Sequence, residues 1–520
     1  MKRFTNSRFL FAAFLAAFLG ACVFYAYREI WVFISPYLSF MGGAMGLFCV
    51  FMAAAAALLV LFVLRLYGEK RGCEAPVYKT RRFGAAAVIA TVIGALGVLA
   101  AVGFIAVNDW QTNRVMVMYL KRMAPWMALA VGAVLGLVVL PVLKGKKKVF
   151  LAAALAVCVL LTVLLQVFPV AFYRITSDPL VLDTGADYSV VFATSAEGTG
   201  FVEYEYKGEN YTVYAQNDGR IVGDRLIHSV HVPYEHLRNN DYSVGSTRVI
   251  EQYSYGSRPG KTVKSGDYHF TVPTGDETSY LVVSDWHSYT DRALDASTYF
   301  GDYDAVLLMG DAAAGMDFEE EAAEFIVKFG GDLTRGAIPA VFVRGNHDTR
   351  GAFAADLPGY LGLTSLYYTV SINGVSFVVL DSGEDKEDSH IEYGGMDDYA
   401  RQRRAELEWL QNLAVEDDRV IVLTHAWQVS EPEPEVSAAA WNEFDRLGVR
   451  FLLCGHQHKC RLLGNTEEEK AMLEAHPGIT AYISGYGKQR VVSMLTVRRG
   501  DVQILATGGD PFQIDLTEQW

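Results

Sequence analysis

Five long apolar stretches in the first third of the chain limit what this protein can fold into. They cover residues 9–27, 41–64, 83–107, 124–143 and 149–172, and none contains a charged residue. Each has roughly the 17–25 residues that a helix needs to cross a bilayer. A helix satisfies its own backbone hydrogen bonds inside lipid. The stretches therefore predict an α-helical membrane domain of about five spans over residues 1–172.

The basic residues between these stretches predict the orientation of this domain. Lys2, Arg3 and Arg8 precede the first stretch, five basic residues lie within 70–82, and four lie within 144–148. With five crossings all three clusters lie on one side, which the positive-inside rule identifies as cytoplasmic. Basic residues in the third loop run against this orientation. The sequence predicts a cytoplasmic amino terminus and an extracytoplasmic location for everything after the last span.

The membrane domain is expected to be an anchor. Its spans contain few polar residues, whereas ion and substrate pathways need ionisable groups inside the bilayer. Gly42 with Gly46, and Gly132 with Gly136, have the spacing that allows close helix packing, including self-association between copies. The sequence LGAC, which ends at Cys22, resembles a bacterial lipobox and would make Cys22 a lipid-modified end. A chance match inside a helix rich in small residues is the preferred interpretation.

The charge balance reverses after the last apolar stretch. Residues 1–172 contain 17 Lys and Arg against 4 Asp and Glu, whereas residues 173–520 contain 28 against 55. A basic membrane part joined to an acidic soluble part explains the overall net charge of −14. Nucleic acid is not an expected partner, because phosphate backbones bind to basic surfaces.

Residues 176–275 have the pattern of a β-rich domain. Short strand-like runs are separated by turns rich in Gly, Asn and Asp. Seven such runs in about a hundred residues are typical of an immunoglobulin- or fibronectin-like β-sandwich.

The residues that can carry chemistry come in five blocks of Asp, Asn and His. Each block follows a short apolar run that predicts a buried strand, and such strands place the next residue at the carboxyl edge of a sheet. Five of the eleven histidines lie in these blocks. The blocks are Asp285–His287, Gly310–Asp311, Gly345–Asp348, His425 and Gly455–His458.

The ligand types in these blocks predict a metal site. Carboxylate and amide oxygens mixed with imidazole nitrogens suit Mn, Fe or Zn, and they differ from the thiolates of structural zinc sites. Two ions would need a bridging ligand, and a carboxylate has two oxygens to provide one. Asp311 is the natural bridge.

The order of the blocks, D-x-H, G-D, G-N-H-D, H and G-H-x-H, resembles the calcineurin-like metallophosphoesterase superfamily over residues 278–500. The resemblance implies a four-layered α/β/β/α domain over 278–520 that holds two divalent or trivalent ions. The implied ligands are Asp285, His287, Asp311 and His458 for one ion, and Asp311, Asn346, His425 and His456 for the other.

The resemblance also implies a reaction with phosphate esters. Two cations bind phosphoryl oxygens and lower the pKa of a bound water to roughly 7, so that hydroxide attacks phosphorus. His347 would donate a proton to the leaving oxygen, and Asp348 would orient its other ring nitrogen. Arg350 is suited to bidentate phosphate binding, with a solvated surface arginine as the alternative.

The segment RLIHSVHVPYEHLRNNDYSV at 225–244 is similar to the fibronectin-like domain that precedes the catalytic domain in purple acid phosphatases. The catalytic motifs differ from that group. This chain has Asp285-Trp286-His287 in place of D-x-G, and Ala314 in place of the tyrosine that follows the G-D motif. We therefore expect a relative with the same domain order but without the tyrosinate-coloured iron site.

Two functions remain open at this point. The first is a membrane-anchored, outward-facing phosphoester hydrolase. The second is a catalytically silent sensor or adhesion protein that retains the fold. A complete ligand set together with His347 favours the enzyme, since degenerate relatives lose ligands.

Overall fold

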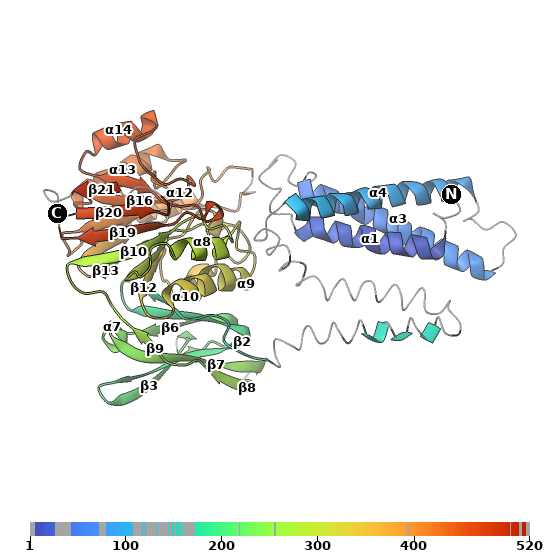
Figure 1. Ribbon diagram of the computed structural model, residues 1–520, viewed down its shortest axis with the longest axis horizontal. Helices are drawn as coiled ribbons and strands as arrows, with labels where there is room; N and C mark the ends of the chain where they lie inside the picture. The colour runs from blue at the N-terminus through green and yellow to red at the C-terminus, as the bar shows by residue number, and fades with distance from the viewer. Residues whose placement is uncertain are drawn as a thin grey trace. The chain divides into compact units, whose positions relative to one another are not determined.

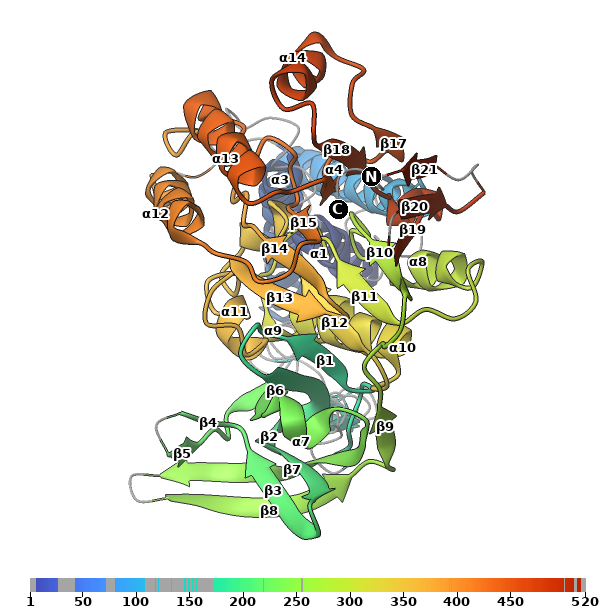
Figure 2. The same cartoon turned by 90° about the vertical axis from the view of Figure 1, so that its left-hand side faces the viewer.

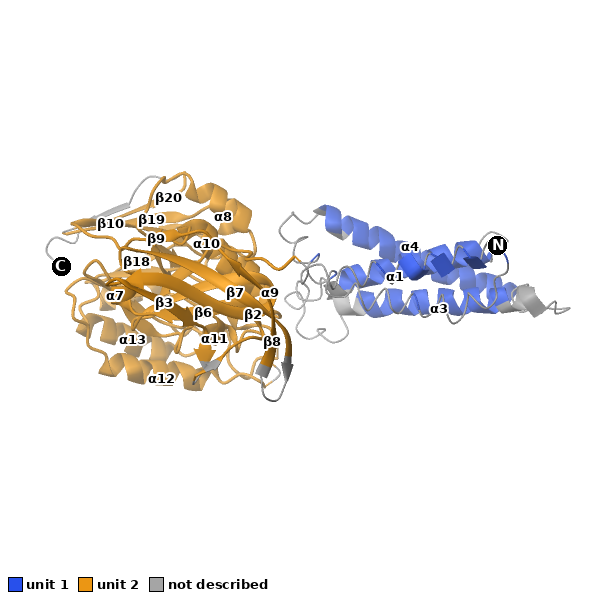
Figure 3. Cartoon of the chain, turned by 90° about the horizontal axis from the view of Figure 1, so that it is seen from below, with its two compact units in different colours: residues 1–169 blue, residues 170–520 orange. Residues whose placement is uncertain are grey.

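The computed structural model describes residues 6–26, 43–71, 80–107, isolated residues between 117 and 160, and 172–515 except 218, 254, 255, 392, 394, 500 and 509–511. The chain divides into two compact units, Met1–Pro169 and Val170–Trp520, which Figure 3 colours separately.

The described part of the first unit contains three long helices that run side by side (Figure 1). They are α1 (Ser7–Ala26), α3 (Gly43–Arg71) and α4 (Arg81–Val107). Each contains a segment long and apolar enough to cross a membrane: Ser7–Phe24, Leu47–Leu66 and Arg81–Gly103. The described parts of the first three predicted stretches are therefore helical. The predicted spans at 124–143 and 149–172 lie mostly outside the described residues.

Small residues bring α1 and α4 close together. A Cβ atom added at Gly20 would lie 3.4 Å from the backbone of Gly97, and one added at Gly94 would lie 2.8 Å from the Cβ of Ala17. Helices in lipid gain packing energy from such close approach. This contact uses other glycines than the predicted pairs, of which Gly42 and Gly136 lie outside the described residues.

The second unit is built on two large sheets (Figure 2). The larger has thirteen strands, in the order β21-β20-β19-β10-β11-β12-β1-β2-β7-β8 with β3, β6 and β9 attached at its branches. The smaller has the order β13-β14-β15-β16-β18-β17. The strands nearest the site are β10 (Glu277–Val283), β11 (Ala305–Leu308), β12 (Pro339–Phe342), β14 (Val375–Val379), β15 (Val420–Leu423) and β16 (Phe451–Cys454).

The remaining strands between residues 278 and 520 complete these sheets. They are β13 (Tyr368–Ile372), β17 (Arg461–Leu462), β18 (Thr480–Ile483), β19 (Ser493–Arg498), β20 (Asp501–Ala506) and β21 (Phe512–Asp515).

The site-forming strands β11, β12, β14, β15 and β16 are fully buried, and within each sheet β10-β11-β12 and β14-β15-β16 are parallel. This explains their continuous apolar sequences, because a parallel strand is covered on both faces. The two sheets meet where the Tyr280 hydroxyl donates a hydrogen bond to the carbonyl of Ile372 at 3.2 Å. The Tyr280 ring also packs edge-on against Phe377.

Helices cover the outer faces of the two sheets (Figure 2). Leu410, Trp441 and Phe444 share one buried core with Val422 and Leu452 of the smaller sheet. The helices are α8 (Thr290–Ser297), α9 (Glu319–Ala322) with the π-helical turn η5 (Ala323–Lys328), α10 (Phe329–Thr334), α11 (Leu357–Tyr360), α12 (Tyr399–Asn412), α13 (Pro434–Arg446) and α14 (Glu467–Ala475). The layers run helix, sheet, sheet, helix, as the resemblance implied.

The β-rich region belongs to the same compact unit as the rest of residues 170–520. Strand β1 (Leu180–Asp183) pairs in parallel with β12 and antiparallel with the long strand β2 (Tyr188–Tyr206). The larger sheet therefore continues from β12 into this region, and the fibronectin-like domain predicted over 176–275 is not shown. The other strands here are β3 (Glu209–Tyr214), β4 (Gln216–Asn217), β5 (Arg220–Ile221), β6 (Arg225–Val232), β7 (Asn240–Tyr253), β8 (Gly256–Lys264) and β9 (Tyr268–Phe270), with helix α7 (Tyr234–Leu237).

Candidate metal centre

The predicted ligands lie at the carboxyl ends of five parallel strands. Asp285, Asp311 and Asn346 follow β10, β11 and β12, and His425 and His456 follow β15 and β16. Asp285, Asp311 and His456 have positive φ angles of 51°, 58° and 67°. Backbone conformations that are rare for side-chain-bearing residues cluster at functional sites, where surrounding structure holds them in place. The sharp turns direct these side chains into one crevice between the sheets.

The first group of ligand atoms combines Asp285, His287, Asp311 and His458, and these atoms lie within 4.8 Å of one another. The Nε2 atoms of His287 and His458 are 3.0 Å apart. His458 Nε2 is 3.2 Å from Asp285 Oδ1, and His287 Nε2 is 3.5 Å from Asp311 Oδ2. This arrangement could hold a metal ion.

The second group combines Asp311, His425 and His456, again within 4.8 Å. His425 Nε2 lies 3.3 Å from Asp311 Oδ1. Asn346 joins this group, because its Oδ1 lies 3.1 Å from His456 Nδ1. Asp311 thus belongs to both groups, with Oδ2 nearer to His287 and Oδ1 nearer to His425.

Two buried polar atoms at the site lack a hydrogen bond from the described residues, and a bound metal ion would satisfy them. Asp285 Oδ1 and His425 Nε2 make no hydrogen bond within the described part of the chain. Buried polar atoms without partners are costly. The other atoms of these side chains are fixed, since His425 Nδ1 donates to the Met309 carbonyl at 2.7 Å and Asp285 Oδ2 accepts from Ser284 Oγ at 2.5 Å. Outer contacts of this kind orient metal-binding side chains.

The charges in the crevice shift the pKa values of its groups. Burial alone would raise the pKa of Asp311, but the rings of His425 and His347 outweigh it and hold that pKa well below its ordinary value. Burial lowers the pKa of His287 to about 4. Burial also opposes a charged His425, yet the carboxylates of Asp311 and Asp285 raise its pKa to about 10. Ionised carboxylates beside a neutral His287 are in the form that binds metal. The same carboxylates that raise the pKa of His425 would also attract a metal cation.

His347 stands beside the ligands without joining either group. Its Nε2 is 4.0 Å from Asp311 Oδ2, and its side chain is 19% exposed. Its Nδ1 donates a hydrogen bond to the carbonyl of Ala314 at 3.1 Å. The carbonyl of Ala314 therefore has the orienting role that the sequence analysis assigned to Asp348.

Asp348 is instead a buried support for two loops. Its carboxylate accepts hydrogen bonds from the backbone N–H groups of Asp311, Ala312 and Gly345, each at 2.9 Å. These contacts fix the turn that carries Asp311 against the turn that carries Asn346. Burial raises the pKa of Asp348 to about 7.

Arg350 is held by an acidic partner that the sequence analysis did not identify. Its Nε and Nη2 donate to the two carboxylate oxygens of Glu384 at 2.5 and 2.8 Å. Glu384 also accepts hydrogen bonds from the Thr349 and Tyr393 hydroxyls, at 3.0 and 2.9 Å. With Nε and Nη2 bonded to Glu384, the remaining nitrogen of Arg350, Nη1, lies 3.3 Å from His347 Nε2. The guanidinium is thus fixed at the edge of the centre rather than solvated.

Two other residues beside the centre were missed. Glu431 Oε1 lies 3.2 Å from His456 Nε2, so it can orient that ring. The ring of Tyr486 stacks on His458 with centroids 4.1 Å apart and planes 4° from parallel. Tyr486 follows the parallel strand β18, but neither residue lies in a recognisable ligand motif, so only the folded chain reveals them.

Comparison with known proteins agrees with this geometry. Residues 278–460 match the calcineurin-like phosphoesterase family. No curated protein matches the chain.

Solved structures show weak similarity to the chain. PhoD is 12% identical over 66% of this chain and 90% of its own, with a TM-score of 0.41. GAP50, the anchor in the inner membrane complex of Plasmodium, is 10% identical over 46% and 90%, with a TM-score of 0.32. A metallophosphoesterase from Sphaerobacter thermophilus is 15% identical over 46% and 89%, with a TM-score of 0.23.

The motif order, the strand-end placement of the ligands and the family match converge on one part of the chain. Residues 278–460 form a calcineurin-like phosphoesterase domain with a cluster of Asp and His residues that could bind metal.

Proposed function

We propose that this protein is a membrane-anchored, outward-facing hydrolase of phosphate esters with a binuclear metal centre. The observation that carries the proposal is the pair of ligand groups that share Asp311. A shared carboxylate with its two oxygens turned to different groups is what a two-ion site requires. Asp285 Oδ1 and His425 Nε2, which are buried and make no hydrogen bond within the described residues, support the same assignment.

The mixed oxygen and nitrogen ligands suit Mn, Fe or Zn. When bound, two such ions bind phosphoryl oxygens and lower the pKa of a water molecule, which supplies the nucleophile. One ion would be held by Asp285, His287, Asp311 and His458, and the other by Asp311, Asn346, His425 and His456.

His347 is the proposed proton donor to the leaving oxygen. The Ala314 carbonyl fixes one ring nitrogen, and the other faces the crevice close to Asp311. A positioned acid of this kind contributes about 10²–10⁴-fold to the rate. Arg350 forms an ion pair with Glu384 and places a permanent positive charge next to His347. It is the proposed contact for a phosphoryl oxygen.

The membrane anchor and its orientation rest on the first unit. Three helices are long and apolar enough to cross a bilayer, and the basic clusters within 70–82 and 144–148 favour the cytoplasm. With five spans, the unit that contains the centre lies outside. A phosphate ester and the bilayer are then the two partners of the chain.

The experiment that tests the proposal uses the full-length protein in detergent and the substitution Asp311→Asn. The amide keeps the size of the side chain but removes the charge that holds two cations together. We expect bound metal to fall from about two ions towards one or fewer per chain, and hydrolysis of a panel of phosphomonoesters and phosphodiesters with Mn²⁺, Zn²⁺ or Fe²⁺ to be lost.

Asp302→Asn is the matched control, because it removes the same charge from an exposed position ahead of β11. It should leave metal content and activity unchanged. Two ions retained by the Asp311→Asn protein would show that Asp311 does not bridge. Absence of hydrolysis by a parent protein that binds two ions would favour the catalytically silent alternative.

A further inference from the structure

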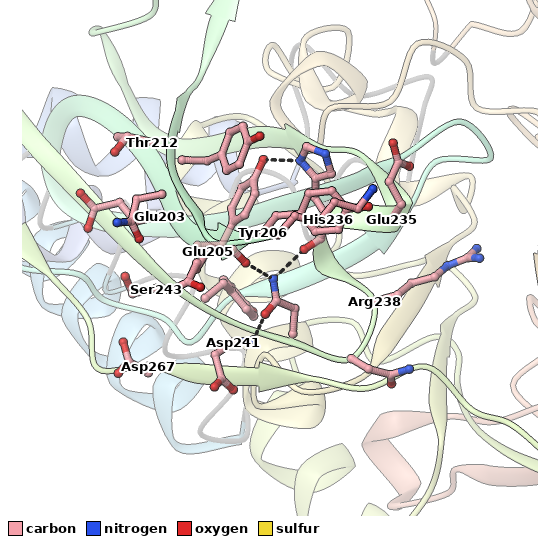
Figure 4. A pocket seen from close by; sticks show the side chains of 17 residues that line it. Glu203, Glu205, Tyr206, Thr212, Glu235, His236, Arg238, Asp241, Ser243 and Asp267 are labelled. Atoms are coloured by element: carbon pink, nitrogen blue, oxygen red, sulfur yellow. Dashed lines mark hydrogen bonds between the residues drawn. The ribbon is translucent and has the colours of Figure 1, made fainter.

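A large hollow lies in the β-rich region, and its lining contains none of the candidate metal ligands (Figure 4). Its volume is about 980 Å³. The lining comes from the end of β2 and the start of β3, from α7, and from the start of β7. A hollow of this size exceeds what a single small amine or ion fills, and it is within the range of ligand sites.

One wall of the hollow is aromatic and preorganised. The rings of Tyr204 and Tyr211 stack with centroids 5.3 Å apart and planes 11° from parallel. The ring of Tyr206 stacks on His236 at 4.1 Å. A hydrogen bond of 2.9 Å between the Tyr204 hydroxyl and His236 Nδ1 ties the two pairs together. The rings are therefore fixed before any ligand arrives.

Carboxylates outnumber cations around this wall. The lining contains five carboxylates, from Glu203, Glu205, Glu235, Asp241 and Asp267, against the two cations of Lys207 and Arg238. Figure 4 shows Glu235 beside His236, with Asp241 and Asp267 on the opposite side of the hollow.

Two of these carboxylates already have hydrogen-bonding partners outside the lining. Glu203 pairs with Lys264 at 2.6 Å, and Asp241 lies 2.7 Å from His269. Among the described residues, Glu205, Glu235 and Asp267 form no ion pair within 4 Å. The hollow therefore retains negative charge that its own side chains do not neutralise.

A lysine of the chain itself places its ammonium group against the aromatic wall. The Nζ of Lys207 lies over the ring of Tyr206, 4.8 Å from its centroid. The Tyr206 hydroxyl, with Glu235 and Tyr211 nearby, raises the pKa of Lys207. Lys207 sits in a turn with a φ angle of 52°, next to Gly208 at 81°. Lys207 is exposed, so another cation can displace it.

We propose that this hollow binds alkylammonium groups, and that a lysine of a basic peptide takes the place of Lys207 on the aromatic wall. Ammonium ions are attracted to the faces of tyrosine rings, and the carboxylates around the wall add to that attraction. The volume accommodates a segment of several residues rather than one side chain. This proposal is independent of the proposed hydrolase activity.

The test measures binding of pentalysine to the full-length protein in detergent at about 0.15 M salt, where long-range attraction is screened. Lys207→Asn suits the turn, because asparagine tolerates positive φ. This substitution removes the ammonium group that covers the ring of Tyr206, so it should tighten pentalysine binding by about two- to fivefold. Tyr206→Leu and Tyr211→Leu change no charge and should each weaken binding by about two- to fivefold.

Lys264→Gln is the matched control, because it also removes one cation near the hollow but leaves the ring of Tyr206 covered by Lys207. It should tighten binding less than Lys207→Asn does. Equal effects of the two lysine substitutions, or unchanged binding by the tyrosine variants, would show that pentalysine binding depends only on the net charge of the hollow. Either result would overturn the proposal. Equal binding of fully acetylated pentalysine would do the same.

A parallel titration with spermidine identifies the source of the ammonium group. Tighter binding of pentalysine supports a peptide partner, whereas tighter binding of spermidine that still depends on Tyr211 assigns the same chemistry to a polyamine. The Asp311→Asn protein should bind pentalysine as the parent does, so failure of the hydrolase proposal would leave this one testable.

Discussion

Replacing His347 and His425 separately should distinguish proton transfer from metal binding. His425 is fully buried, and its Nε2 faces Asp311 within one of the two ligand groups. His347 lies at the rim of the crevice and belongs to neither group. We therefore expect His347→Asn to retain its metal while kcat falls, and His425→Ala to lose metal and activity together.

The expected sizes follow from these positions. Loss of a positioned acid lowers kcat by about 10²–10⁴-fold, which corresponds to about 3–5 kcal/mol in the barrier. The side chain of His347 is 19% exposed, and its contacts include hydrogen bonds to the Ala314 carbonyl and to Arg350, so its loss should lower the free energy of unfolding by about 1–2 kcal/mol. Loss of His425 should weaken metal binding by more than the roughly 10–100-fold typical of an outer contact.

The assay compares two substrates and the metal content of each protein. A nitrophenyl phosphate has a leaving group that needs little protonation, whereas an alkyl phosphate needs a proton. The loss in the His347→Asn protein should be much smaller for the nitrophenyl ester. His269→Asn, at an exposed position outside the centre, controls for the loss of an imidazole. Equal losses for both esters, or metal loss matching that of His425→Ala, would refute the reasoning.

Two further predictions concern stability and topology. Glu319 Oε1 accepts hydrogen bonds from Leu226 and Ile227 N–H, and burial raises the pKa of this carboxyl from 4.5 to about 7. The folded state thus keeps a proton that the unfolded state loses, so stability falls as pH rises from about 4.5 to 7. Glu319→Gln should raise the free energy of unfolding by about 1–2 kcal/mol at pH 8, after allowance for partial exposure, and by nothing near pH 4.5; thermal melts that differ equally at both pH values would contradict this. Reporter fusions should read as cytoplasmic after residues 75 and 146 and as external after residues 30, 115 and 180, and a cytoplasmic signal at 180 would overturn the proposed orientation.

The ligands of the centre were predictable because strand and ligand are adjacent in sequence. A buried apolar run followed by Asp285, Asp311 or Asn346 identifies a strand end, and parallel strands bring their ends to one edge. The outer contacts were not predictable in this way. Glu431 reaches His456, and Ala314 reaches His347, through the paths of loops that no short motif specifies.

Neighbours in sequence also proved a poor guide to contacts in the turn after β12. The family resemblance implied that Asp348, which follows His347 directly, orients that ring. The short helical turn η6 (His347–Thr349) sends the Asp348 carboxylate inward to three backbone N–H groups instead. Side-chain direction in such a turn depends on backbone angles that the sequence does not reveal.

The β-rich region illustrates a different limit. Short apolar runs between turn residues indicated β-structure here, yet they did not indicate the partner of β1. Val181 pairs with Pro339, far along the chain, and Leu180–Leu182 is as apolar as a strand of a sandwich core would be. Local patterns identify a buried strand, but they do not show which sheet it joins.

The parallel pairing of β1 with β12 has a consequence for any attempt to shorten this protein. A fragment that begins at residue 278, where the family match starts, would leave one side of β12 without a partner. That strand, Pro339–Phe342, is apolar and fully buried in the intact chain. An exposed apolar edge recruits strands from other molecules and leads to aggregation. A shortened protein that remains in solution must therefore start before Leu180, so that the edge stays capped.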